Sequence, residues 1–333
     1  MKLVLIACIV AFVVAFIVAK PIISWLLSIK AKQTILEYVE LHKDKQGTPT
    51  MGGLIILFGL IAGSVLCFNG EMYLATMTLI VTLGFGLIGF LDDFLKIKYK
   101  HNLGLQPYQK IIGQVGISVL IGLFCYFSPL IDNALILPFS FESVEIGFWI
   151  VPVVVFVFLS LVNAVNLIDG LDGLAGSVSI TYTIGFMAVL FIYIDFVYSA
   201  GAGALTVNEL TNLGVVGSAL IGSILAFLIF NSNRASVFMG DVGSLAIGGC
   251  LTCLAVFSGL ILYIPLLGIA FVLTALSVVI QVLHYKRTKK RVFLMAPLHH
   301  HFEKKGVNET KIVSIYIILT IIVSVITIML TIF

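Results

Sequence analysis

Charged residues are scarce in this sequence. Asp, Glu, Lys and Arg make up 11% of its 333 residues, whereas hydrophobic residues make up 60%. An ordinary soluble domain has roughly 25% charged residues. A water-soluble core of this size cannot absorb so much apolar surface, so the composition excludes a soluble globular protein. It predicts an all-α, polytopic integral membrane protein.

Long polar insertions, low-complexity tracts and repeats of fixed period are also absent, and the longest polar stretch is 285–310. We therefore expect residues 1–333 to form one helical membrane domain. The five cysteines lie within or at the ends of apolar stretches. Cys250 and Cys253 form a CxxC pair inside such a stretch, where helix packing explains them better than redox or zinc chemistry.

Ten apolar stretches are long enough to cross a hydrocarbon layer as helices, which takes about 20 residues. They cover residues 3–27, 51–68, 72–91, 108–128, 146–165, 174–195, 213–230, 244–259, 260–284 and 311–331. An even number of spans puts both termini on one side of the membrane. The opposite side then carries the connections 28–50, 92–107, 166–173, 231–243 and 285–310.

Lysine and arginine are missing from the loops on the side of the termini, near 69–71, 129–145 and 196–212. All 19 of these cations except Lys2 belong to the other side. The positive-inside rule then makes the basic side cytoplasmic and both termini exoplasmic. We expect a multi-pass membrane protein whose unusual loops face the cytoplasm, and no nucleic-acid partner.

Acidic residues gather in three of the cytoplasmic connections. Asp92 and Asp93 follow an apolar run in "GFLDDFLKI", although neighbours on a helix point about 100° apart and would not form one chelating face unless the helix frays there. Asp169 and Asp172 lie three apart in "NAVNLIDGLDGLAG", and Asp241 lies in "FNSNRASVFMGDVGS". If the spans form a bundle, these acids converge.

Converged carboxylates repel one another and need a cation. Oxygen ligands without a dedicated cage favour Mg²⁺, which keeps waters and is completed by substrate phosphates. In the third loop, Asn231 adds an oxygen ligand and Phe238 could stack on a flat ring. The sequence therefore predicts a magnesium site beside a substrate pocket.

Two further loops on the same side complement the acids. "KQGTPTMGG" offers Lys45 and Thr50 at the mouth of a span, which suits a phosphate or a polar headgroup. "PLHHHFE" supplies His299, His300 and His301, of which one or two are expected to contact an anionic substrate or move a proton. Phosphoryl transfer between a soluble nucleotide and a membrane phosphate fits this set.

These five motifs, in this order on alternate connections of a ten-span chain, are together very specific. They resemble those of the polyprenyl-phosphate N-acetylhexosamine-1-phosphate transferases, glycosyltransferase family 4, over essentially the whole chain. "LHHHF" is similar to the mark of the branch that uses UDP-MurNAc-pentapeptide. The resemblance implies transfer of phospho-N-acetylmuramoyl-pentapeptide to undecaprenyl phosphate, with release of UMP, formation of lipid I and dependence on Mg²⁺.

The resemblance also implies roles for individual residues. Asp241 is similar to the Mg²⁺ ligand, with Asp169 beside it, and Asp92 or Asp93 to the group that activates the lipid phosphate. His300 joins them as a catalytic candidate, and Lys110 matches a family lysine for which Lys96 and Lys100 compete. The implied substrate-binding residues are Lys45, Thr50, Lys110, Asn166, Asp169, Asp172, Asn231, Phe238, His299 and His301.

Several alternatives stay open at this point. Asp92 or Asp93 could form a covalent phospho-enzyme, or could only remove a proton so that undecaprenyl phosphate attacks directly, which we favour. A transferase acting on UDP-N-acetylglucosamine differs only in the histidine loop. A transporter would instead place acids near the middle of its spans and show repeats. Exposed spans leave room for a homodimer, although no motif requires one.

Overall fold

The chain folds into a bundle of long helices, which confirms the prediction of an all-α polytopic membrane protein. The computed structural model describes residues 2–29, 31, 47–99, 104–131 and 133–333. Within these residues the helices are α1 (Lys2–Ser28), α2 (Gly53–Val65), α3 (Tyr73–Tyr99), α4 (Pro107–Phe127), α5 (Ile150–Ile168), α6 (Leu174–Ser199), α7 (Ala204–Asn231), α8 (Gly240–Phe257), α9 (Ile264–Leu267), α10 (Ile269–Thr288), α11 (Leu298–Lys304) and α12 (Glu309–Ile332). Two single-turn 3₁₀ helices, η2 (Gly147–Trp149) and η3 (Ile261–Tyr263), precede α5 and α9.

Among the described residues, nine helices are long and apolar enough to cross a membrane. They correspond to nine of the ten predicted spans. The other predicted span, 51–68, is only the 13-residue helix α2, about 20 Å long at 1.5 Å per residue. It is therefore shorter than the usual length of a membrane-spanning helix.

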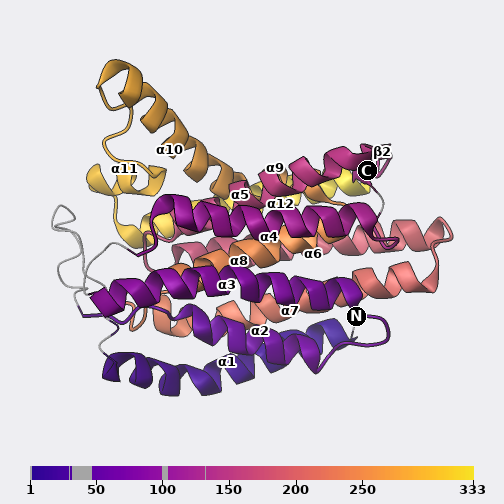
Figure 1. Cartoon of the computed structure of the whole chain (residues 1–333), viewed down its shortest axis with the longest axis horizontal. Coiled ribbons are helices and arrows are strands. Elements are labelled where there is room, and N and C mark those ends of the chain that lie inside the picture. Colours follow the sequence, from indigo (N-terminus) through magenta and orange to yellow (C-terminus); the bar gives the residue numbers. More distant parts are fainter. Residues whose placement is uncertain (1, 30, 32–46, 100–103, 132) are drawn as a thin grey trace.

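Helices α7 and α8 form the centre of the bundle. Every residue from Val242 to Phe257 of α8 is buried, as expected for a helix that is apolar all round. This helix packs against α3 and α5, while α7 packs against α1, α2 and α6. Figure 1 shows these helices running along the long axis of the molecule, with α10 leaving the bundle at an angle and leading to α11.

Three helix boundaries differ from the predicted spans, for physical reasons. Helix α3 continues past 91 to Tyr99 because Lys96 neutralises acids within the same helix. Helix α7 starts nine residues before 213, because a polar residue in its first turns binds the start of α3. Glu209 accepts hydrogen bonds from the backbone N–H groups of Tyr73 and Leu74, both at 2.9 Å. The span 260–284 is broken, because Pro265 lies in the first turn of the short helix α9 and α10 starts only at Ile269.

The connection between α4 and α5 contains two short strands that the sequence did not predict. Strand β1 (Ala134–Ile136) pairs antiparallel with β2 (Ser143–Glu145). Both chain termini lie at the same end of the bundle, and α11 lies at the other end (Figure 1). We call the end that holds α11 and the last turns of α3 the acidic end.

Candidate active site

Three carboxylates meet at the acidic end. Asp92 and Asp93 lie on α3 and Asp241 lies in the first turn of α8, and one oxygen of each lies within 4.8 Å of the others. Asp92 and Asp93 are 3% and 2% exposed. The two adjacent acids do share a site without fraying of α3, because the third carboxylate comes from a different helix.

Close packing of α3 against α8 makes this meeting possible. A side chain at Gly89 would collide with the backbone of Asp241, so only glycine allows this approach. Gly240 has φ +72°, a left-handed conformation that favours glycine, and a side chain there would also meet the Asp93 carboxylate. These two glycines allow α3 and the start of α8 to approach closely enough for the three carboxylates to meet.

Two lysines bind the carboxylates. Lys96 Nζ lies 2.5 Å from Asp92, 3.6 Å from Asp93 and 3.2 Å from Asp241. Lys110 Nζ lies 2.5 Å from Asp241 and 3.8 Å from Asp92. Lys96 and Lys110, which competed for one role in the sequence, therefore both belong to the cluster. Lys100 lies outside the described residues.

Backbone and amide groups fix the carboxylates further. Asp93 accepts a hydrogen bond from the N–H of Val242 at 3.1 Å, and Asp92 accepts one from the N–H of Leu105 at 2.9 Å. The Asn166 amide donates to Asp241 Oδ1 and to the Ser244 hydroxyl, both at 2.8 Å. Asp241 also lies where the dipole of α8 favours negative charge.

The loop after α5 brings Asp169 close to this cluster but not into the group of three carboxylates. The residue is partly exposed, yet burial of its carboxyl group, followed by the charges of Asp241, Asp93 and Asp172, raises its pKa to about 8. The negative charges of the cluster therefore act on the Asp169 carboxyl group. The prediction of five converging acids is met by three, with a fourth nearby.

Asp172 and Asn231 hold the loops beside the cluster together. The Asp172 carboxylate accepts a hydrogen bond from the N–H of Ala235 at 3.1 Å. Asn231 is buried, accepts from the N–H of Gly173 at 3.1 Å and donates to the carbonyl of Val237 at 2.9 Å. Sequence reasoning considered both only as substrate-binding residues, and the structure gives both a part in positioning the loops.

The segment before α2 lies alongside the segment before α8. Phe238 donates its N–H to the carbonyl of Pro49, and its own carbonyl accepts from Gly52, both at 2.8 Å. This pairing places buried Thr50 beside Gly240 and leaves the Phe238 side chain partly exposed. Lys45 lies outside the described residues.

The histidine triplet lies on α11, which packs against the loop after α5. The His299 side chain is 0% exposed and its ring lies against Gly170, where any side chain would collide with it. Burial, and then the neighbouring His300, lower the pKa of His299 to about 3, so its ring is neutral. Gly170 therefore makes room for the His299 ring.

The other two histidines have separate partners. His300 Nδ1 lies 2.9 Å from Glu303 Oε2, one turn along α11. His301 Nδ1 accepts a hydrogen bond from the N–H of Leu294 at 3.1 Å. Both rings are partly exposed, so they are accessible to a ligand while His299 is not.

Sequence reasoning missed some members of the site. Ser244 and Glu303 each lie three residues after a predicted site residue on the same helix, and this spacing could have identified them. The N–H of Leu105 gave no signal, because backbone contacts between distant segments leave no residue pattern.

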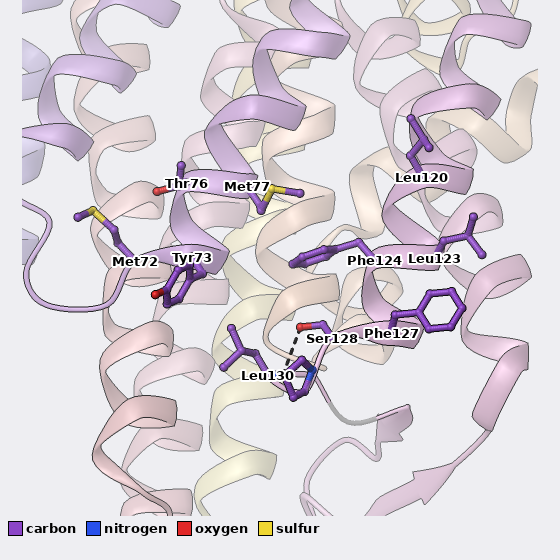
Figure 2. Close-up of a pocket in the computed structure, with 11 residues that line it drawn as sticks. Met72, Tyr73, Thr76, Met77, Leu120, Leu123, Phe124, Phe127, Ser128 and Leu130 are labelled. Atoms are coloured by element: carbon purple, nitrogen blue, oxygen red, sulfur yellow. Dashed lines mark hydrogen bonds between the residues drawn. The ribbon is translucent and has the colours of Figure 1, made fainter.

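A large apolar pocket lies far from these residues. It opens between the start of α3 and the end of α4, and is lined by Met72, Tyr73, Leu120, Phe124 and Leu130 among others (Figure 2). Tyr73 and Asp92 are 19 residues apart on one helix, about 28 Å along its axis. The pocket thus has no part in the chemistry at the acidic end.

With all three carboxylates ionised, the three aspartates and the two ammonium groups beside them carry one net negative charge. Such a set can hold a hard metal cation together with an anionic ligand. Held phosphates would then meet lysines at the point where apolar helices end. This arrangement suits phosphoryl transfer between a lipid and a soluble compound.

Comparisons with known proteins agree with this chemistry. Residues 75–259 match the model for glycosyl transferase family 4, and residues 45–57 match the first phospho-N-acetylmuramoyl-pentapeptide-transferase signature. The phospho-N-acetylmuramoyl-pentapeptide-transferase of Clostridioides difficile is 40% identical over 95% of this chain and 94% of its own length. Those of Thermoanaerobacter sp. and Geobacter sp. are 39% and 42% identical, over 97% and 91% of this chain and 96% and 85% of their own lengths.

Proposed function

The chain belongs to glycosyl transferase family 4, and on this premise we propose that it transfers phospho-N-acetylmuramoyl-pentapeptide from UDP-MurNAc-pentapeptide to undecaprenyl phosphate. The products are UMP and lipid I. The observation that carries the proposal is the cluster of Asp92, Asp93 and Asp241 with two lysines at the ends of apolar helices. The high identity to transferases over nearly the whole chain favours this function over a transporter.

The metal of this site is Mg²⁺ in our proposal. All the donors are carboxylate oxygens, and three carboxylates offer too few ligands to complete the coordination shell, which suits a cation that keeps waters and binds substrate phosphates. Asp241 would be its main ligand, with Asp169 at its edge. When bound, the ion would neutralise charge on the diphosphate.

Direct attack by the lipid phosphate is the mechanism that the contacts support best. An oxygen of undecaprenyl phosphate forms a bond to the sugar-linked phosphorus of the UDP substrate, and the bond from that phosphorus to UMP breaks. Asp92 and Asp93 each accept a hydrogen bond from a backbone N–H and contact Lys96, and these contacts hold both carboxylates in place. In this mechanism they take a proton from the lipid phosphate and orient it.

The remaining predicted residues divide between the two ends of the soluble substrate. Phe238, partly exposed, would stack on the uracil ring, with Asp172 and Asn231 shaping the loops around it. Asn166 would hold Asp241 in place beside Lys110.

Anion recognition would come from the loops at the rim of the site. Thr50, with Lys45 before it in the chain, is adjacent to the metal ligand helix. His300 and His301 are accessible and would contact the muramoyl-pentapeptide or its phosphates, with His300 as a proton carrier held by Glu303. Buried His299 would act by seating α11 on the loop of Gly170.

Orientation and assembly complete the proposal. We place the acidic end in the cytoplasm of a bacterial cell, with the protein in the plasma membrane, because lysines and arginines gather at this end. Residues 1–333 would act as one domain. A homodimer through lipid-facing helices is a further proposal, and measurement of the mass of the detergent-solubilised protein would test it.

The direct test measures UMP release by purified protein in detergent with UDP-MurNAc-pentapeptide and undecaprenyl phosphate, with Mg²⁺ and with EDTA. Mg²⁺-dependent release coupled to a lipid-linked product supports the proposal. Turnover of UDP-N-acetylglucosamine in its place would move the chain to the other branch. Release of UMP without undecaprenyl phosphate, up to one equivalent per enzyme, would favour the covalent mechanism.

A further inference from the structure

A carboxylate from the last helix holds the loop that follows α5. The backbone N–H of Asp172 donates to Glu309 Oε1 at 2.7 Å, although the two residues lie 137 positions apart in the chain. Glu309 is the first residue of α12. A short hydrogen bond to an ionised acceptor is among the stronger ones in proteins, so this contact ties the loop to the start of α12.

The next residue of the loop is held in the same way from another side. The N–H of Gly173 donates to Asn231 Oδ1, at the end of α7. The Asp172 side chain in turn accepts from the N–H of Ala235. Two consecutive backbone N–H groups are therefore fixed by side chains from α12 and α7, and together these bonds set the direction in which Asp172 points.

The segment that contains Glu309 also contacts the loop at a second place. On α11, His299 lies against Gly170, two residues before Asp172. The stretch from α11 to the start of α12 thus contacts the loop at Gly170 and at Asp172. A displacement of Glu309 would move Asp172 relative to Phe238 and the rest of the proposed nucleotide pocket.

Glu309 is not needed to start its own helix. Asn308 caps α12 by accepting hydrogen bonds from the N–H of Thr310 at 2.9 Å and from its hydroxyl at 2.7 Å. The inner face of α12, with buried Ile312 and Tyr316, packs the helix against the bundle. The contact of Glu309 with the loop is therefore separable from the folding of α12.

We propose that Glu309 is a positioning residue for the nucleotide pocket, acting through the backbone of Asp172. The proposal rests on the function proposed above. It assigns to the start of α12 a role in binding the UDP part of the substrate rather than in the phosphoryl transfer step. Replacing Glu309 should therefore weaken substrate binding without changing the rate at which bound substrate reacts.

The test compares Glu309→Ala, Glu309→Gln and the control Asn308→Ala with the wild-type protein in detergent. We expect Glu309→Ala to raise both the KM for UDP-MurNAc-pentapeptide and the Kd for UMP by about tenfold, with kcat changed less than about twofold. Glu309→Gln keeps an oxygen acceptor and should recover much of the affinity. Asn308→Ala removes only the helix cap, so it should lower Tm and leave KM unchanged.

Three outcomes would overturn the proposal: an unchanged KM in Glu309→Ala, an equal rise of KM in Asn308→Ala, or a loss confined to kcat. Hydrogen exchange at the amides of Asp172 and Gly173 gives an independent readout, and should be faster in Glu309→Ala than in Asn308→Ala. If wild-type protein neither binds UMP nor turns over UDP-MurNAc-pentapeptide, the proposed function itself fails. Faster exchange would then establish only the contact, and the role in nucleotide binding would be refuted.

Discussion

Gln114 and Asn163 exchange two hydrogen bonds between α4 and α5, of 2.7 and 3.4 Å. Gln114 is fully buried and lies one helical turn from Lys110, while Asn163 lies three residues before Asn166. Lys110 and Asn166 are the two residues that bind opposite oxygens of Asp241. The amide pair therefore fixes the register of the two helices directly below Asp241.

Replacing one member of this pair should destabilise the protein. In Gln114→Leu, Asn163 loses both hydrogen bonds to Gln114 and keeps only the one to the carbonyl of Leu159, so we expect a loss of about 1 to 2 kcal/mol. The double variant Gln114→Leu with Asn163→Leu should lose less than the sum of the single variants, because no unpaired amide remains. Thermal unfolding in detergent measures both. Strict additivity would show that the two amides do not interact.

Removing the charge of Asp241 should abolish turnover while the bundle remains folded. We expect Asp241→Asn to lose at least about a hundredfold in kcat, since in our proposal Asp241 holds the cation that offsets negative charge on the transferred phosphate. Asp195→Asn makes the same change at an exposed position of α6 and should keep its activity. Near-normal turnover by well-folded Asp241→Asn protein would refute its assignment as the metal ligand.

Metal binding should also be visible without turnover. Because a ligand that binds only the folded state stabilises it, we expect Mg²⁺ to raise the Tm of the wild-type protein and EDTA to reverse the rise. The rise should be absent in Asp241→Asn and present in Asp195→Asn. An equal rise in both variants would place the ion elsewhere.

Acid should weaken the fold through His299. Its pKa is about 3 in the folded protein, against roughly 6.5 in an unfolded chain. Below pH 6.5 the unfolded chain takes up a proton that the folded protein does not, so stability is complete above this pH and falls as the pH falls towards 3. For this one group the slope is at most about 1.4 kcal/mol per pH unit.

Tm measured between pH 8 and pH 5 checks this prediction. His299→Gln removes the titrating ring, so its Tm should depend less on pH than that of the wild-type protein. His284 is exposed on α10, and His284→Gln should keep the wild-type dependence. Identical pH dependence in His299→Gln and wild type would contradict the buried, neutral state of His299.

Much of this architecture was readable from the sequence, because membranes impose a simple rule on helix length and composition. That rule located nine of the spans and put the acids, lysines and histidines at one end. It could not show that α2 is short, or that Glu209 extends α7 by capping α3, since both depend on neighbours distant in the chain. The strands β1 and β2 were missed for the same reason.

The chemistry of the site was predictable in type and less so in arrangement. Aspartates flanked by apolar runs predicted a charged site, and the carboxylates of Asp92, Asp93 and Asp241 do lie together. The sequence could not show that the side-chain amide of Asn231 binds the backbone of Gly173 and Val237. Nor could it identify Glu309 as a site residue, because only the structure shows that its carboxylate binds the backbone N–H of Asp172.

The position of Lys96 has a consequence for how the protein is made. It lies one helical turn from Asp92 on α3, whereas Asp241 lies 145 residues further along the chain. At about 5 to 20 residues per second, a ribosome needs roughly 7 to 30 s to synthesise that interval. During this time the two aspartates of α3 can already pair with a counter-ion carried by their own helix. The nascent helix thus enters the lipid with less uncompensated charge, and exchanges part of that pairing for Asp241 only when α8 arrives.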